Sequence, residues 1–141
     1  MAWVGDVITV GDKELIYFGG YAEGHKVGQR RLGVATLRKD GFVSYDTTSA
    51  EGILCTRPFT WAAKQLTVNA TVRGELRARL LFAESGLPIP GFFWRDCEPI
   101  HDDSVAHPVR WKGDVGVPTG KSVRLEFSLR DAELYGFEMI R

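Results

Sequence analysis

A short polar segment carries the densest set of side chains that could do chemistry. Residues 95–104 read Arg-Asp-Cys-Glu-Pro-Ile-His-Asp-Asp-Ser, and Pro99 within them favours a loop. Hard cations such as Ca²⁺ take several oxygen ligands at flexible geometry, and an acidic loop supplies such ligands. We therefore consider a structural calcium ion here, although the fold would require no cofactor. Its ligands would be Asp96, Glu98, Asp102 and Asp103.

Two other interpretations of this acidic loop stay open. The loop lacks the spacing of an EF-hand, and its Asp and Ser side chains could instead cap turns and pair with Arg95 or Arg110. Alternatively, Asp96 with Asp102 or Asp103 could form the paired carboxylates of a small glycoside hydrolase, which lie roughly 5–10 Å apart. Nothing in the sequence marks a raised pKa among them, so we assign no catalytic residue and favour a protein that is not an enzyme.

Aromatic residues beside the same loop suggest a binding surface. A sugar stacks its apolar C–H face on an exposed ring, while its hydroxyl groups need a few polar partners. In Phe92-Phe93-Trp94 successive side chains alternate if the backbone is extended, and Trp94 leads into the charged loop. We predict ring stacking on Trp94, with Tyr21 as a second ring and hydrogen bonds from Arg95 and Asp96. The alternative is that all four tryptophans are buried in the core.

The elements that position these residues have the periodicity of strands. Apolar residues alternate with polar ones in 66–72, 75–80 and 123–130, and no stretch has a useful helical period. Arg73-Gly74 predicts a hairpin turn between the first two of these strands. Short strands separated by turn residues are typical of an antiparallel β-sandwich, here a jelly-roll-like one. The length of 141 residues predicts one domain spanning 1–141.

The two cysteines and the charge balance exclude some classes. Cys55 and Cys97 could form one bridge or stay as free thiols, and neither lies in a zinc-type pair. The 18 basic residues equal the 18 acidic ones, whereas nucleic-acid-binding proteins usually carry a basic excess. No apolar run reaches the ~20 residues that span a bilayer. We therefore expect neither nucleic acid nor membrane as a partner.

Four segments carry a resemblance to a known family. They are Ile16–Tyr21 with His25, Arg30–Arg38, Asp40–Ser44, and Val123–Arg130 continuing to Phe137. Together they resemble the C-terminal region of bacterial glycoside-hydrolase-like proteins that have a five-bladed β-propeller. The resemblance implies that residues 1–45 correspond to strands of a propeller end, and that a terminal β-sandwich follows.

The resemblance also suggests a function. At 141 residues the chain has no room for a propeller, whose pocket holds the carboxylates in that family. We therefore expect a non-catalytic accessory module that binds a glycan or packs against an adjacent catalytic domain. The alternative is a purely structural module with no ligand. The chain shows no signal peptide, and as part of a larger protein it would be secreted or periplasmic.

Overall fold

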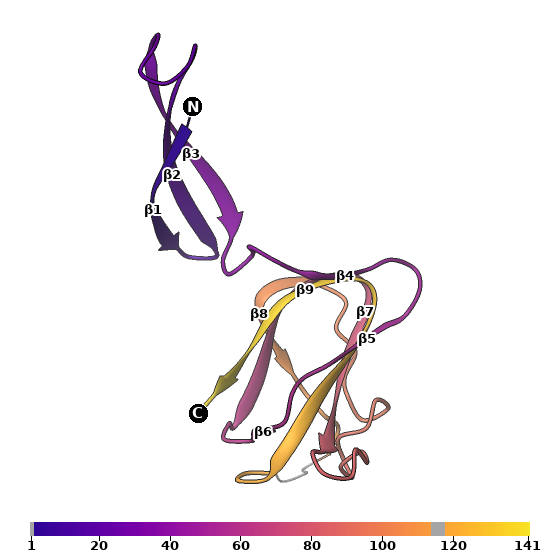
Figure 1. Cartoon of the computed structure of the whole chain (residues 1–141). Coiled ribbons are helices and arrows are strands. Elements are labelled where there is room, and N and C mark those ends of the chain that lie inside the picture. The colour runs from indigo at the N-terminus through magenta and orange to yellow at the C-terminus, as the bar shows by residue number, and fades with distance from the viewer. Residues whose placement is uncertain (1, 114–117) are drawn as a thin grey trace. The chain divides into compact units, whose positions relative to one another are not determined.

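A computed structural model describes residues 2–113 and 118–141, and its regular elements are β-strands (Figure 1). The predicted all-β class is confirmed. The strands are β1 (Ala2–Val10), β2 (Lys13–Tyr21), β3 (Arg30–Arg38), β4 (Tyr45–Thr47), β5 (Gly52–Cys55), β6 (Phe59–Thr60), β7 (Gln65–Phe82), β8 (Asp103–Val109) and β9 (Ser122–Ile140). In this part of the chain, no helix is long and apolar enough to cross a membrane.

The chain divides into two compact units, Met1–Val43 and Ser44–Arg141. We call them the N-terminal sheet and the C-terminal sandwich. The single domain over 1–141 stays a prediction, and the boundary of the two compact units lies between Val43 and Ser44.

The N-terminal sheet is a three-stranded antiparallel meander in the order β1-β2-β3. The turn from β1 to β2 contains Gly11 at φ 59°, a left-handed conformation that glycine adopts without steric cost. Along β2, Leu15 lies opposite Ile8, and Ile16 lies opposite Val7. Because successive side chains of a strand point to opposite faces, each face of this sheet carries apolar residues.

The C-terminal sandwich is built on its two longest strands. β7 and β9 run antiparallel side by side over their whole length, in a six-stranded sheet of order β4-β9-β7-β8 (Figure 1). On its other edge β9 pairs in succession with β6, β5 and β4. The architecture is consistent with the predicted β-sandwich.

The predicted hairpin turn at Arg73-Gly74 is wrong, because β7 continues through these residues with a bulge between Val72 and Glu75. A Cβ added to Gly74 would lie 2.3 Å from the backbone oxygen of Arg130, so the two strands approach closely here. The facing residue, Asp131, has φ 45°, and its Oδ1 accepts a hydrogen bond of 3.2 Å from Arg73 Nε. Gly74 thus permits a bulge in β7 where β7 and β9 pair irregularly. The chain continues in the same direction through this bulge and forms no hairpin.

The core of the sandwich is formed mainly by residues of β7 and β9, together with residues of the segments beside them. The predicted inward alternation is confirmed in 76–80 and 123–129, whereas in 66–70 every residue is buried, Thr67 and Asn69 included. Trp61 is buried, with its indole N–H donating to the Ala63 carbonyl at 2.8 Å. The buried cluster comprises Trp61, Ala63, Leu66, Val68, Ala70, Val72, Leu76, Ala78, Leu80, Ile89, Phe92, Cys97, Ile100, Val109, Val123, Leu125, Phe127, Leu129, Ala132 and Leu134.

In the N-terminal sheet, by contrast, no large apolar side chain of the described residues 3–43 is buried. Leu15, Ile16 and Leu37 are half-buried. The exposed apolar residues of this unit are Trp3, Val4, Val7, Ile8, Val10, Tyr17, Phe18, Val27, Leu32, Val34, Phe42 and Val43. The strands of this sheet therefore pair with one another, but their described residues form no hydrophobic core.

Candidate functional site

The second half of β7 and the first half of β9 present a polar surface, which we call the outer face. Leu76, Ala78 and Leu80 of β7 are buried, so the residues between them point away from the core. The register sets Arg77 opposite Ser128 and Arg79 opposite Glu126. The outer face comprises Glu75, Arg77, Arg79, Glu126 and Ser128.

Trp94 is held beside the outer face by the segment that runs along the free edge of β7. The Leu80 amide donates to the Phe92 carbonyl at 3.2 Å, and the Ile100 amide donates to the Leu76 carbonyl at 2.9 Å. The Arg77 guanidinium reaches across, with Nη1 donating to the carbonyls of Trp94 at 3.2 Å and Cys97 at 3.1 Å. A strand side chain therefore fixes the backbone that carries the tryptophan.

The charges of the outer face are paired. Arg77 makes two hydrogen bonds with the Glu75 carboxylate, at 2.8 and 3.1 Å, and these bonds are the main reason that the pKa of Glu75 is lowered. Arg79 Nε lies 2.6 Å from Glu126 Oε2. The Arg79 guanidinium also lies 4.6 Å from the centre of the Trp94 ring, a cation–π distance. The tryptophan is thereby packed against a fixed cation.

These side chains border a shallow depression of about 320 Å³. Within its lining the Ser128 hydroxyl donates to Glu51 Oε1 at 2.5 Å. The lining therefore combines an aromatic ring with carboxylate, hydroxyl and guanidinium groups. Its residues are Glu51, Glu75, Arg77, Trp94, Arg95 and Ser128.

Two of the four residues predicted to bind a ligand, Trp94 and Arg95, line this depression. Asp96 is not part of the lining: its Oδ2 accepts a hydrogen bond of 3.1 Å from the Phe93 amide, so its carboxylate closes a turn. Tyr21 belongs to the N-terminal sheet, where its ring centre lies 5.7 Å from that of Trp3. Ligand binding by all four residues stays a prediction.

The acidic loop uses its side chains locally. Asp102 Oδ1 lies 2.8 Å from His107 Nδ1, and Asp103 is the first residue of β8, opposite Thr71. Glu98 is exposed, and its amide donates to the Arg110 carbonyl at 2.9 Å. Within residues 2–113 and 118–141, no three His, Cys, Asp or Glu side chains gather as metal ligands do. The calcium ion stays a prediction.

The two cysteines are free thiols with different surroundings. Cys97 is buried, its Sγ accepts a hydrogen bond of 3.2 Å from the Ala78 amide, and burial raises its pKa to about 11. Cys55 is exposed on β5, opposite Glu126. Neither thiol has the lowered pKa that nucleophilic cysteines require.

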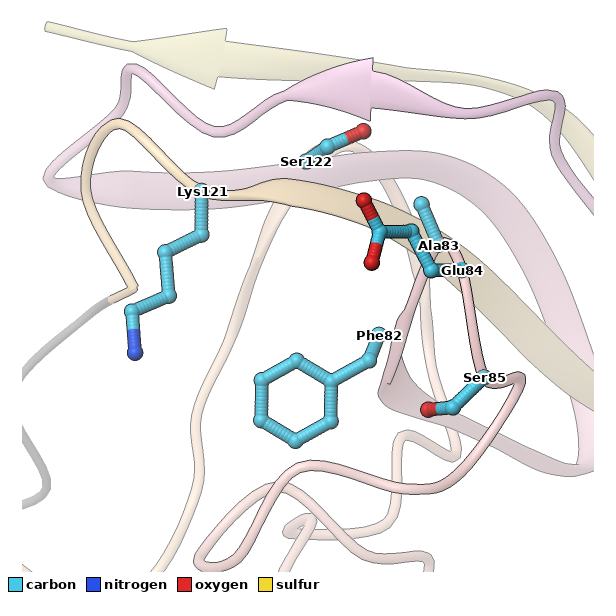
Figure 2. A pocket seen from close by; sticks show the side chains of 6 residues that line it. All are labelled: Phe82, Ala83, Glu84, Ser85, Lys121 and Ser122. Atoms are coloured by element: carbon cyan, nitrogen blue, oxygen red, sulfur yellow. The ribbon is translucent and has the colours of Figure 1, made fainter.

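A second depression of about 430 Å³ lies where β7 ends and β9 begins. Figure 2 shows the Phe82 ring and the Lys121 side chain bordering it, and Lys121 Nζ lies 5.9 Å from the centre of that ring. The remaining lining residues are Ala83, Glu84, Ser85 and Ser122. The lining of this second depression has one aromatic ring and no arginine. It therefore lacks the arginine–carboxylate hydrogen bonds that fix the side chains of the outer face.

Sequence reasoning found Trp94 and Arg95 but missed the residues opposite them. The alternation of 75–80 and 123–130 indicates that their polar residues face solvent. It does not indicate which residues of the two strands lie opposite each other. Glu51 lies far from both segments in the chain. A signal was present in the arginines of Glu75-Leu76-Arg77-Ala78-Arg79, because Arg is a frequent partner of exposed rings.

Comparison with known proteins gave no match among protein-family models, curated proteins or solved structures. The functional interpretation therefore depends on the geometry of the two units.

Proposed function

We propose that the C-terminal sandwich is a non-catalytic carbohydrate-binding module and that the outer-face depression is its binding site. One observation carries the proposal: Trp94, with the Arg79 guanidinium 4.6 Å from its ring centre, lines a depression whose other lining residues are polar. A saccharide needs this combination, because it presents apolar C–H faces together with hydroxyl groups.

The site is organised before any ligand arrives. Arg77 holds the Trp94 backbone and Arg79 packs on its ring, so the tryptophan loses little conformational freedom on binding. Glu51 and Ser128 are already hydrogen-bonded to each other. Binding a sugar would then cost less ordering entropy than binding to mobile surface side chains.

The chemistry of the carboxylates supports binding over hydrolysis. A glycosidase needs a carboxylic acid with a raised pKa to protonate the leaving group. In the depression, Arg77 lowers the pKa of Glu75, which keeps that group ionised as a hydrogen-bond acceptor. Asp96, a residue of the alternative hydrolytic loop, accepts a backbone hydrogen bond that closes a turn.

Native affinity electrophoresis of the whole chain tests the proposal. The gels would contain galactomannan, xylan, mixed-linkage β-glucan or hydroxyethyl cellulose. We expect at least one of them to retard the protein, and Trp94→Ala to abolish the retardation. Phe82→Ala, which removes the ring of the second depression, is the matched control and should still be retarded. Failure of every polysaccharide to retard the wild type, or retardation unchanged by Trp94→Ala, would contradict the proposal.

A second candidate function, docking onto an adjacent domain, is favoured by the N-terminal sheet. Both of its faces carry exposed apolar residues, among them Ile8 and Val34 on one face and Val4 and Phe18 on the other. Exposed apolar patches in folded proteins commonly mark surfaces that another protein covers. The family resemblance would make that protein a β-propeller.

The gene or reading frame next to this one supplies the test. We expect its product to contain a β-domain and to co-purify with the whole chain. Introducing Tyr17→Lys and Val34→Lys together should abolish this co-purification. Glu138→Lys on β9 is a matched control, because it adds positive charge to the C-terminal sandwich. Equal co-purification of all three proteins, or of none, would count against docking through this sheet.

A further inference from the structure

We infer that the outer-face depression selects neutral, hydroxyl-rich saccharides and discriminates against acidic ones such as uronates. The inference rests on the proposed function and specifies the class of ligand. It follows from which hydrogen-bonding groups at the depression are already occupied and which remain available.

The guanidinium donors of Arg77, the less exposed of the two arginines that line the depression, are largely occupied. Arg77 uses Nε and Nη2 for the Glu75 carboxylate, and Nη1 for the carbonyls of Trp94 and Cys97. Arg79 uses Nε for Glu126, and its guanidinium carbon lies 4.6 Å from the centre of the Trp94 ring. A carboxylate or sulfate ester is bound best by an open, two-pronged guanidinium. Arg77 does not offer one, because its Nε, Nη1 and Nη2 all donate to acceptors of the protein.

The remaining capacity consists mainly of acceptors. An ionised carboxylate accepts about four hydrogen bonds in total. Glu51 accepts one at Oε1 from Ser128, and Glu75 accepts two from Arg77. Their other acceptor positions suit hydroxyl donors, which every neutral sugar has in excess. A carboxylate on the ligand would instead face these two carboxylates.

The lining has no net charge that would attract an anion. It contains two glutamates, Glu51 and Glu75, and two arginines, Arg77 and Arg95. Arg95 is 79% exposed at the rim, where salt screens its charge, and its guanidinium lies 4.7 Å from the Phe93 ring centre. Affinity should therefore come from stacking and neutral hydrogen bonds, and it should depend little on ionic strength.

Affinity electrophoresis with paired polysaccharides, followed by tryptophan-fluorescence titration at 20 mM and 500 mM NaCl, tests this selectivity. The neutral probes are galactan, galactomannan and xylan, and the acidic probes are polygalacturonate and alginate. We expect retardation by a neutral probe and none by the acidic ones, with a dissociation constant that changes less than about twofold between the two salt concentrations. Glu51→Gln should weaken binding about fivefold, whereas Glu84→Gln, at the second depression, should leave it unchanged.

The outcomes separate the two proposals. If an acidic polysaccharide binds as tightly as the neutral ones, or if salt weakens binding tenfold, selectivity for neutral saccharides is overturned and carbohydrate binding stands. If Glu51→Gln and Glu84→Gln weaken binding equally, the assigned acceptor is wrong. If no probe of either kind binds, the proposed function fails together with the inference.

Discussion

The N-terminal sheet and the C-terminal sandwich are built from the same kind of strands but are stabilised differently. In the sandwich, alternate residues of β7 and β9 enter one shared core, where Val68, Leu80 and Phe127 are fully buried. In the N-terminal sheet the backbone pairing is equally regular, yet Tyr17 and Phe18, on opposite faces of β2, are both exposed.

This difference shows that strand pairing and fold stability are separable. Net stabilisation comes mainly from apolar area removed from water, because hydrogen bonds between strands replace hydrogen bonds to water. A three-stranded sheet needs a covered apolar face for independent stability. The sandwich buries its own apolar face and can present a fixed outer face, whereas the N-terminal sheet has no buried large apolar side chain among its described residues 3–43.

The largest expected effect comes from separating the two units. Residues 44–141 expressed without the rest should unfold cooperatively on heating, because they contain the whole buried cluster. Residues 1–43 expressed without the rest should lack a cooperative transition. Circular dichroism melting of both fragments and of the whole chain makes the comparison. A sharp transition in the 1–43 fragment would contradict it.

The next prediction compares one residue type in the two units. Phe127 is fully buried, so Phe127→Ala should lower the free energy of unfolding of the sandwich by about 3–5 kcal/mol. Phe18 is 39% exposed in the N-terminal sheet. Phe18→Ala should therefore leave the free energy of unfolding of the sandwich within about 0.5 kcal/mol of the wild-type value. Urea titrations measure both values, and similar losses in the two variants would show that the units share a core.

The buried thiol of the sandwich should make its stability depend on alkaline pH. The pKa of Cys97 is raised to about 11, so above pH ~9 the unfolded chain releases this proton while the native chain retains it. Releasing the proton lowers the free energy of the unfolded state, and the free energy of unfolding falls by about 1.4 kcal/mol per pH unit between pH 9 and 11. Comparing Cys97→Ala with wild type isolates this loss of about 2–3 kcal/mol. An identical pH profile in the two proteins would contradict the prediction.

The smallest effect concerns the bulge in β7. A methyl group at Gly74 would meet the Arg130 backbone oxygen at 2.3 Å, so Gly74→Ala should cost about 1–3 kcal/mol. Gly136 on β9 has no atom within 4 Å of the corresponding position, and Gly136→Ala is the matched control. The melting temperature of Gly74→Ala should be well below that of Gly136→Ala. Equal melting temperatures would contradict the prediction, because they would mean that β7 and β9 separate easily at this point.

Much of the sandwich could be predicted from its sequence. The alternation in 123–130 identified the buried residues, because a strand with one buried face repeats every two residues. In 66–72 it identified the buried apolar residues but missed Thr67 and Asn69, which are buried on the other face. The Arg73-Gly74 hairpin was wrong because a glycine tolerates both a turn and a close strand approach. Only the register of β7 against β9 distinguishes the two.

The candidate site could be predicted only in part. Trp94 and Arg95 are adjacent in the chain, and their position beside a charged loop marked them. Their partners Glu51, Arg77 and Ser128 come from separate segments that pair through long-range hydrogen bonds. Asp96 was predicted as a ligand-binding residue because of its charge. Its carboxylate accepts a hydrogen bond from the Phe93 amide, a local contact that composition does not reveal.

Amide hydrogen exchange along the whole chain tests most directly the claim that the C-terminal sandwich has its own core and the N-terminal sheet has none. We predict slow exchange, close to that of global unfolding, for the buried residues of β7 and β9, from Leu76 to Leu80 and from Val123 to Leu129. The amides of β1, β2 and β3 should exchange several orders of magnitude faster. Equal protection of β2 and β7 would contradict the claim.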